Sequence, residues 1–215
     1  MSSKDQFIQS LQAELTAVKP LKSPVVRSAL WCLATFGFSL GLLLMTGPLR
    51  PGVFAQLAKP QFLAETILGF LPLWTASYAL FRLNIPGIKV SSVDIALSFF
   101  PFVLFSLFLV YGMLVEPALA PSMAGKREHC VVEVAYVSVL PLIFLLWQLK
   151  QGYSLYTPTQ FMLMGIAASS VPMAAMQMIC MYDPTHNLKF HFGPALVVAF
   201  VSTGIGTLWY RVFRK

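Results

Sequence analysis

The sequence has few charged residues. It contains 215 residues, of which 15 are Lys or Arg and 8 are Asp or Glu, so that 11% are charged, whereas soluble domains have about 25%. Apolar residues account for 57% of the chain, above the roughly 45–50% that is usual in soluble proteins. So few charges cannot coat the surface of a soluble protein of this length. The composition therefore excludes a soluble domain and indicates a protein whose surface contacts lipid.

Cysteine is also scarce. The chain has three cysteines, Cys32, Cys130 and Cys180, and no Cys-x-x-Cys motif. A membrane thiol–disulfide enzyme that passes electrons to quinone needs a second pair of cysteines, or at least this motif. The scarcity of cysteine therefore argues against such an oxidoreductase, which stays open only as an alternative.

Ionisable groups are missing from the centres of the apolar stretches. No base lies near a centre, and the acids Glu65, Asp94 and Glu133 each lie within about a turn of the end of a stretch. Pumps and transporters use polar or ionisable groups at membrane depth. The absence of a polar track argues against a pump, and a small transporter or metal-efflux protein stays open as an alternative function.

Long apolar runs, in contrast, are abundant. A membrane-spanning helix needs about 20 mostly apolar residues, and several stretches satisfy this requirement. The connections between them carry Pro, Gly, Lys and Arg. We therefore predict an all-α membrane protein with six transmembrane helices. The expected spans cover residues 28–47, 62–81, 93–115, 130–149, 158–180 and 192–210.

The first span contains a GxxxG motif formed by Gly37 and Gly41. Such a motif lets two helices approach closely. In a chain with six helices, we expect it to serve packing within the bundle and not dimerisation.

Lys and Arg are unequally divided between the two sides of the predicted membrane domain. The N-terminal segment, the second and fourth loops and the C-terminus carry ten of the fifteen, and the other side carries five. Cytoplasmic loops have an excess of Lys and Arg, so we expect both termini in the cytoplasm. The net charge of +7 then reports orientation and gives no support to nucleic-acid binding. The predicted parts are a cytoplasmic N-terminal segment (1–27), a six-helix membrane domain (28–211) and a cytoplasmic tail (212–215).

The N-terminal segment has an apolar face. Apolar side chains recur there at helical spacing, and Pro20 closes the segment, which predicts a short amphipathic helix of about 15 residues. Such a helix is marginally stable alone and needs a surface that covers its apolar face. The nearly neutral charge of residues 1–18 favours a groove on a protein partner, and docking on its own bundle or on lipid is the alternative. The predicted partner-binding residues are Phe7, Ile8, Leu11, Leu15 and Val18, with Glu14 at the rim.

Two cysteines are predicted to meet at the outer side of the membrane. The topology places Cys130 at the outer start of the fourth span and Cys180 at the outer end of the fifth. Adjacent antiparallel helices would bring the two residues to one level, and Cα separations below about 7 Å permit a disulfide. An oxidising periplasm permits the bond chemically.

Histidines and carboxylates lie near this cysteine pair in the sequence. Thiolate, imidazole and carboxylate groups in one small volume suit Zn²⁺, Cd²⁺ or similar ions. The residues leave three interpretations open: a structural disulfide, two unpaired buried thiols, or a sensor that switches by oxidation or metal capture. The candidate metal ligands are Cys130, Cys180, His129, His186 and His191, with Glu133 and Asp183 nearby.

At these two regions the sequence resembles the negative regulator of sigma F family, which comprises multi-span inner-membrane anti-sigma factors of extracytoplasmic-function sigma factors. In the N-terminal segment the similarity lies in Leu11, Glu14-Leu15, Val18-Lys19-Pro20-Leu21, Pro24 and Arg27. Further along the chain it lies in Gly125, Cys130, Leu140-Pro141-Leu142, Pro158, Gly165 and Cys180.

The resemblance implies a bacterial inner-membrane protein without catalytic activity or a resident cofactor. It implies that the cytoplasmic N-terminal segment holds an extracytoplasmic-function sigma factor away from core RNA polymerase. It also implies that the two outer cysteines, here Cys130 and Cys180, are needed to release the sigma factor under oxidative or heavy-metal stress. A heavy-metal ion would then be bound only transiently.

Overall fold

The computed structural model describes residue 6 and residues 21–152 and 157–213. The six residues predicted to bind a partner, from Phe7 to Val18, and the predicted amphipathic helix lie outside the described residues. The long helices are α2 (Pro24–Thr46), α4 (Pro60–Leu83), α5 (Ser92–Leu114), α6 (Cys130–Leu149), α7 (Pro158–Ile179) and α9 (Gly193–Phe213). Two short helices, α3 (Val53–Gln56) and α8 (Pro184–His186), and a π-helix (Asn187–Phe192) complete the fold.

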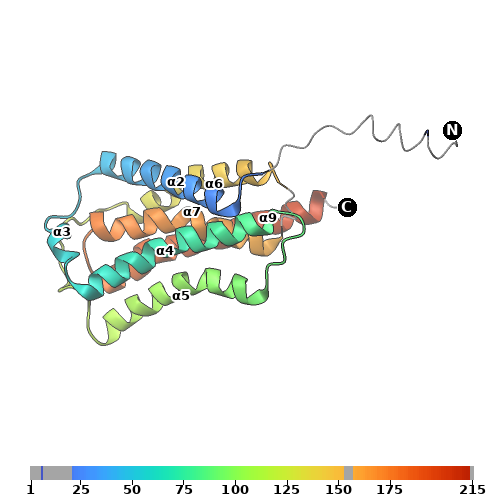
Figure 1. Cartoon of the computed structure of the whole chain (residues 1–215). Helices are drawn as coiled ribbons and strands as arrows, with labels where there is room; N and C mark the ends of the chain where they lie inside the picture. Colours follow the sequence, from blue (N-terminus) through green and yellow to red (C-terminus); the bar gives the residue numbers. More distant parts are fainter. Residues whose placement is uncertain (1–5, 7–20, 153–156, 214–215) are drawn as a thin grey trace.

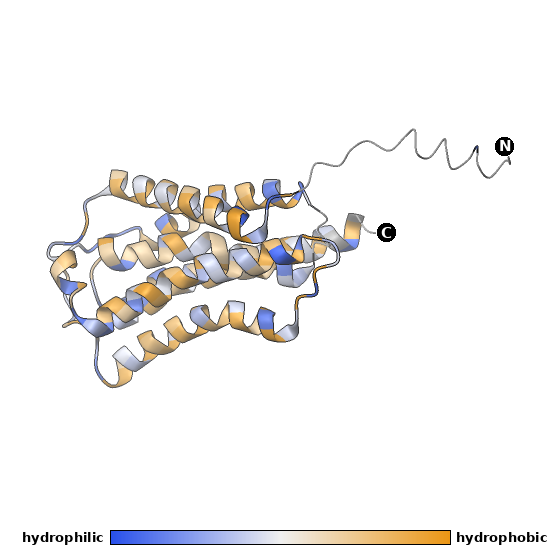
Figure 2. Ribbon diagram, viewed as in Figure 1, coloured by the Kyte–Doolittle hydropathy of each residue, from blue (hydrophilic) through white to orange (hydrophobic). Residues whose placement is uncertain are grey.

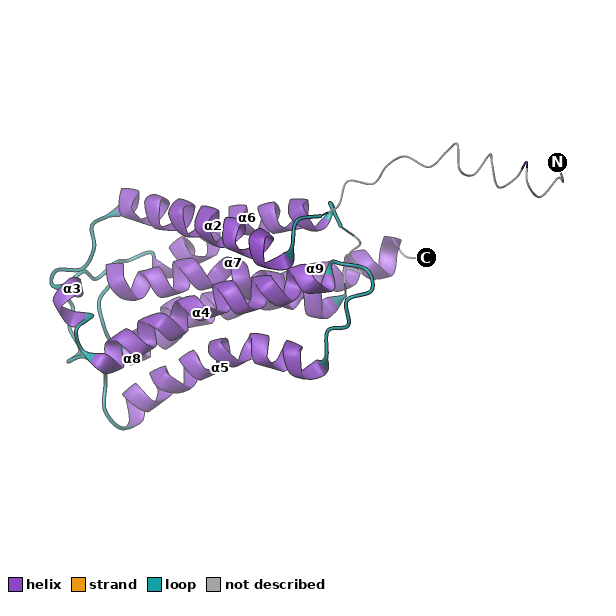
Figure 3. Cartoon of the chain, viewed as in Figure 1, coloured by secondary structure: helices purple, strands orange, loops and turns teal. Residues whose placement is uncertain are grey.

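Six helical segments are long and apolar enough to cross a membrane. Residues 21–152 and 157–213 contain no β-strand, and loops join the helices directly (Figure 3). Figure 2 shows apolar residues along the length of the helices, with hydrophilic residues mostly toward their ends. The prediction of an all-α membrane protein with six transmembrane helices is therefore confirmed. The sixth segment begins earlier than expected, at Pro184, because α8 and the π-helix run directly into α9.

The starts of these helices follow local sequence signals. Proline occupies the first turn of α2, α4, α7 and α8, where its missing N–H removes no helical hydrogen bond. Ser91 and Asp94 form a capping box at α5, and Thr157 and Gln160 form one at α7. These side chains satisfy N–H groups that the first turn of a helix leaves free.

Helix α7 forms the centre of the bundle. It packs against α2, α4, α6 and α9 (Figure 1), and it is the most buried of the six spans. Its small residues permit this close packing: a Cβ atom at Gly165 would lie 2.5 Å from the Cα atom of Ala199 in α9. Such close approach of helix backbones is typical of membrane helix pairs.

Helix α2 lies at the periphery and is the least buried span. Gly37 and Gly41 on this helix are exposed, and a Cβ atom added to either would meet nothing within 4 Å. The expectation that this GxxxG motif serves packing within the bundle is therefore wrong. The motif faces outward because buried residues such as Trp31 and Leu43 occupy the opposite face of the helix.

The chain enters α2 and leaves α9 at the same end of the bundle, as an even number of spans requires (Figure 1). The short helices α3 and α8 lie at the opposite end, where α6 begins and α7 ends. We call this opposite end the outer end, after the orientation predicted from Lys and Arg, and the end with the termini the inner end.

Candidate metal centre

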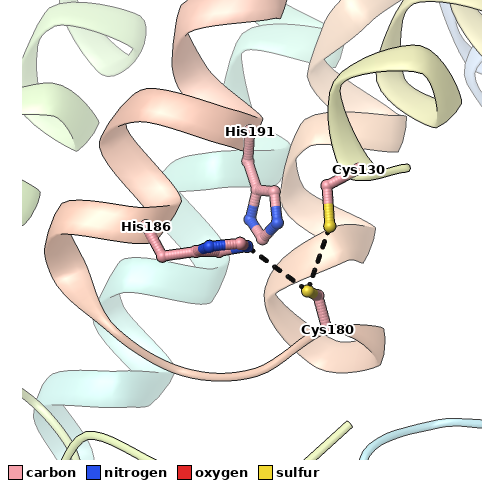
Figure 4. Close-up of side chains that lie close together, drawn as sticks. All are labelled: Cys130, Cys180, His186 and His191. Carbon is pink, nitrogen blue, oxygen red and sulfur yellow. Dashed lines mark hydrogen bonds between the residues drawn. The ribbon is translucent and has the colours of Figure 1, made fainter. Parts of the chain in front are cut away.

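Cys130 and Cys180 meet at the outer end of the bundle. Cys130 is the first residue of α6, and Cys180 directly follows α7. Because these neighbouring helices run antiparallel, the start of one lies beside the end of the other. The two Sγ atoms are 3.1 Å apart (Figure 4), and both residues are buried, with 2% and 0% exposure. Both cysteines are free thiols.

Two histidines complete a cluster around this pair. The Nε2 atom of His186 is 3.4 Å from the Sγ atom of Cys180, and the ring of His191 lies 5.0 Å from the ring of His186 in an edge-on arrangement. One ligand atom from each of the two cysteines and two histidines lies within 4.8 Å of the other three. Figure 4 shows the four side chains converging from α6, the end of α7 and the segment that follows it.

The π-helix accounts for the convergence of the two histidines. Residues five positions apart in an α-helix point about 140° away from each other. The wider turn that begins at Asn187 reduces this angle and brings His191 to the same side as His186. Single π-helical turns occur frequently at functional sites.

His191 is a buried imidazole without a hydrogen-bond partner. Its exposure is 0%, and neither ring nitrogen has a partner of hydrogen-bonding geometry among the described residues. Gln177, one turn before Cys180, and Asn187, next to His186, are also buried, and their side-chain amides have no hydrogen-bond partner in the part of the chain that the structure describes. Buried polar groups without partners are costly. Polar groups in this state beside two thiols indicate a place for a ligand.

The electrostatic environment favours a thiolate at Cys180. The hydrogen bond between the Cys130 and Cys180 sulfurs lowers the pKa of Cys180, and the neighbouring imidazole of His191 lowers this pKa further, although burial opposes both effects. The thiolate is the form of cysteine that binds metals and attacks oxidants. The pKa of Cys180 is therefore shifted toward the thiolate form, while the side chain itself is fully buried.

The four groups match the ligand set of a tetrahedral Zn²⁺ or Cd²⁺ site. Two thiolates and two imidazoles at about 2.3 and 2.1 Å from Zn²⁺ would be about 3.4–3.8 Å from one another. The observed distance of 3.4 Å between Cys180 and His186 lies at the edge of this range, the sulfurs are closer together at 3.1 Å, and the four ligand atoms lie within 4.8 Å of one another, so an ion would have to draw the four groups into position. The sulfurs also lie within a small movement of the roughly 2.0 Å of a disulfide bond. The same atoms can therefore capture a metal ion or become oxidised.

The structure places the other predicted residues differently. His129 precedes α6, is exposed, and is not one of the four clustered residues. Asp183 accepts a hydrogen bond from the backbone N–H of His186 at 2.7 Å, so it caps α8 and positions that histidine. Glu133 is buried and forms an ion pair with Arg127. Of the five predicted metal ligands, the fold brings together Cys130, Cys180, His186 and His191.

Two arginines at the site were counted in the sequence only for their charge. The carbonyl oxygen of Arg127 accepts a hydrogen bond from the thiol of Cys130 at 3.5 Å, and Nη1 of Arg50 donates to the carbonyl oxygen of Cys180 at 2.9 Å. Arg127 lies three positions before Cys130, so its place in the sequence could have indicated that it contacts this cysteine. Arg50 is 130 positions from Cys180, and no local pattern predicts this contact.

Tyr182 anchors the chain just after Cys180. Its hydroxyl donates to the carboxylate of Glu65, at 3.0 and 3.2 Å, and accepts from the N–H of Ala118. Burial and the nearby carboxylate raise the pKa of Tyr182, so the phenol keeps its proton and remains a donor. This contact holds the segment between α7 and α8 against α4.

Comparison with models of protein families gives a match over nearly the whole chain. The model of a protein family described as "Negative regulator of sigma F" matches residues 11–212 of the chain. No curated protein and no solved structure matches it. The matched range covers all six spans and most of the N-terminal segment.

Proposed function

Since the chain belongs to the negative regulator of sigma F family, and so to a family of anti-sigma factors, we propose that it holds an extracytoplasmic-function sigma factor at the bacterial inner membrane. Both termini would lie in the cytoplasm, and the cysteine site would face the periplasm. Metal binding or oxidation at Cys130 and Cys180 would release the sigma factor. The observation that carries this proposal is the cluster of two thiols and two imidazoles, of which only His186 is partly exposed.

The N-terminal segment is the proposed binding site for the sigma factor. Its apolar face, with Phe7, Leu11 and Leu15 at helical spacing, fits a groove on a protein partner. The segment directly precedes α2 at the inner end of the bundle, which is the cytoplasmic side in the proposed orientation. No direct contact with nucleic acid is needed, because sequestration of the sigma factor is enough to prevent transcription.

Metal capture is the first proposed signal. A divalent soft ion such as Cd²⁺ would bind both sulfurs and the imidazoles of His186 and His191, and the two thiols would lose their protons. Reversing a 99:1 preference between two conformations takes about 5.5 kcal/mol of differential stabilisation. Structural four-ligand sites bind Zn²⁺ with about 10–16 kcal/mol, so a metal ion can supply enough free energy for the switch.

Oxidation is the second proposed signal. The Cys180 thiolate would attack a peroxide, giving a sulfenic acid and water or an alcohol. Cys130 would then attack the sulfenic sulfur, forming the disulfide and releasing water. Both cysteines lose their hydrogens, and the peroxide accepts the two electrons.

The third cysteine does not belong to the proposed sensor. Cys32 lies in α2, about two turns from the inner end, and its thiol contacts the carbonyl oxygen of Leu73 and the hydroxyl of Ser77 at 3.7 and 3.6 Å. A relay that passed electrons from the outer pair would need a partner cysteine near them. This placement supports a regulator over a thiol–disulfide enzyme.

Co-purification tests the proposed function. The full chain, solubilised in mild detergent, is expected to retain a co-expressed extracytoplasmic-function sigma factor. The pair Leu11→Asp and Leu15→Asp should reduce retention about a hundredfold or more, because charge replaces two central apolar contacts. The pair Gln9→Asp and Gln12→Asp adds the same charge at polar positions and should leave retention unchanged. Equal retention by all variants would refute the role of the N-terminal segment.

A further inference from the structure

We propose that two arginine contacts at the outer end of α2 connect the cysteine site to the N-terminal segment. We call them the α2 clasp: Arg127 with Thr46, and Arg50 with the carbonyl oxygen of Cys180. In the resting state the clasp holds α2 where the N-terminal segment binds its partner, and loss of the thiol hydrogens loosens it. The inference rests on the proposed function for its biological meaning, although the clasp itself is testable without a sigma factor.

The first contact joins α2 to the segment before Cys130. Nη1 of Arg127 donates to the hydroxyl of Thr46, the last residue of α2, at 2.6 Å and to Glu133 at 3.0 Å. The guanidinium also lies against Gly47, where an added Cβ atom would be 2.6 Å from Nη2. Thr46 and Gly47, at the end of α2, therefore pack closely against the Arg127 side chain.

The second contact joins the chain after α2 to the end of α7. Arg50 is almost fully buried, with 2% exposure. Its Nη1 atom donates to the carbonyl oxygen of Cys180, its backbone N–H donates to Met178, and its Nε and Nη2 atoms donate to the side chain of Gln56. Arg50 thus fixes the loop between α2 and α3 on the residue that carries one of the sulfurs.

In the proposed mechanism, both arginine contacts depend on whether Cys130 and Cys180 keep their thiol hydrogens. The single hydrogen of the Cys130 thiol has two acceptors within reach, the carbonyl oxygen of Arg127 and the sulfur of Cys180. Metal capture and disulfide formation both remove this hydrogen, so each abolishes the hydrogen bond to Arg127. Each also moves the Cys180 sulfur toward a new partner and displaces the carbonyl oxygen that Arg50 holds. One structural response therefore follows from two chemically different signals.

Between its ends, α2 has few side-chain hydrogen bonds to the rest of the described bundle and is held there mainly by apolar packing. Four of its buried polar side chains have no hydrogen-bond partner among the described residues: Ser28, Trp31, Thr35 and Ser39. Cys32 makes only the two long contacts to Leu73 and Ser77. The strong side-chain hydrogen bonds lie at the inner end, from Arg27 to Asn84 and Gln148, and at the clasp. Since α2 is the least buried span, releasing the clasp frees its outer end to move.

Gly47→Ala tests the clasp without changing a charge. The added Cβ atom displaces the Arg127 guanidinium, which is the flexible end of a side chain, so the fold can accommodate it. Gly41→Ala is the matched control, because it lies on the same helix and its Cβ atom meets nothing within 4 Å. Thr46→Val removes the hydroxyl at nearly constant side-chain volume. It therefore breaks the contact between Arg127 and Thr46 in a second, independent way.

Hydrogen–deuterium exchange of the full chain in detergent provides the first measurement. In the wild type, Cd²⁺ should accelerate exchange in the peptide covering residues 47–57 by about tenfold, since the hydrogen bonds that hold it are weakened. Gly47→Ala and Thr46→Val should show this faster exchange without Cd²⁺, and Gly41→Ala should behave as the wild type. Wild-type exchange in both clasp variants would overturn the proposal.

Retention of the sigma factor provides the second measurement. The clasp variants should release the partner without Cd²⁺, whereas Gly41→Ala should retain it until Cd²⁺ is added. If the clasp variants retain and release the partner as the wild type does, the clasp does not transmit the signal and the proposal is overturned. If no version binds a sigma factor but exchange responds as expected, the clasp stands and the proposed function fails.

Discussion

The carbonyl oxygen of Cys180 accepts a hydrogen bond from Nη1 of Arg50 at 2.9 Å, across 130 positions of sequence. This contact joins the end of the most buried span to the loop that follows the least buried one. In the proposed mechanism, a change at Cys180 is passed through this hydrogen bond to the loop that follows α2. The cysteine site and the first span are thus in direct contact, although the sequence separates them widely.

The four clustered side chains should bind one Zn²⁺ or Cd²⁺ ion per chain. His186→Gln and His191→Gln should each weaken binding at least about a hundredfold, since loss of even an outer partner of a metal ligand costs 10–100-fold. Titration of the detergent-solubilised chain with Cd²⁺, followed by the thiolate–metal absorbance, measures this. His129→Gln should bind as the wild type, because His129 is exposed and outside the cluster. A stronger effect of His129→Gln than of His191→Gln would contradict the assignment.

Cys180 should remain reactive at a pH where ordinary thiols do not. The lowered pKa of Cys180 keeps the thiolate populated as pH falls from 8 to 6, and only further acidification through the folded-state pKa removes it. Labelling of Cys180 by methyl methanethiosulfonate, followed by mass spectrometry, should therefore change little over this range. In Cys130→Ala, which lacks the hydrogen-bond donor, the rate should fall about tenfold per pH unit below the ordinary thiol pKa near 8.5. An equally steep fall in the wild type would count against a thiolate at Cys180.

The same pKa shift affects stability. Because the pKa of Cys180 is lower in the folded state, the hydrogen bond to the thiolate contributes stability above the ordinary thiol pKa, and this contribution is lost as pH falls through the folded-state value. Cys130→Ala should thus lower the free energy of unfolding more at pH 9 than at low pH. Equilibrium unfolding in mixed detergents at several pH values measures the loss of unfolding free energy in this variant and shows whether it grows with pH, as expected.

Peroxide should link Cys130 to Cys180 within one chain. The sulfurs are 3.1 Å apart, so only a small movement is needed to form the bond. Mass spectrometry of the peroxide-treated chain should find a peptide pair containing both residues, with the loss of two hydrogens. Cys32 should remain labelled by maleimide after denaturation, because it is on another part of the bundle. A disulfide that includes Cys32 would exclude the proposed pair as the redox site.

Tyr182→Phe should destabilise the outer end. The substitution removes the donor that satisfies the buried carboxylate of Glu65, and a buried acceptor without a partner costs about 1–3 kcal/mol. The free energy of unfolding in mixed detergents provides the measurement. Tyr111→Phe removes a hydroxyl from an exposed tyrosine and should change this free energy by less than about 0.5 kcal/mol. Similar effects of both substitutions would show that Tyr182 does not anchor the segment.

Gly165→Ala should destabilise the contact between α7 and α9. An added Cβ atom would lie 2.5 Å from the Cα atom of Ala199 and would also overlap the hydroxyl of Ser202, and overpacking of this kind costs about 1–3 kcal/mol. Gly204→Ala on α9 is the control, because its Cβ atom would meet nothing within 4 Å. If both substitutions leave the unfolding free energy unchanged, the two helices are not packed this closely.

Several features followed from sequence because they depend on local patterns. The number of spans could be predicted from the lengths of the apolar runs, since a bilayer requires about 20 apolar residues per helix whatever the neighbours are. The meeting of Cys130 and Cys180 could also be predicted, because both lie at outer ends of consecutive antiparallel helices. The amphipathic N-terminal helix and the cytoplasmic position of the termini remain predictions.

Other features depended on tertiary structure. A π-helical turn, which apolar periodicity does not reveal, brings His186 and His191 together, whereas His129 precedes α6 and is exposed. The outward face of Gly37 and Gly41 depends on which side of α2 the rest of the bundle covers. The sequence alone determined the membrane architecture and the cysteine pair, because both follow from the lengths of the apolar runs and the residues at their ends. Only the packed bundle decided which histidines join that pair, because this depends on the helix geometry after Cys180. It also decided that Arg50 and Arg127 tie the pair to α2, because these contacts connect residues distant in the chain.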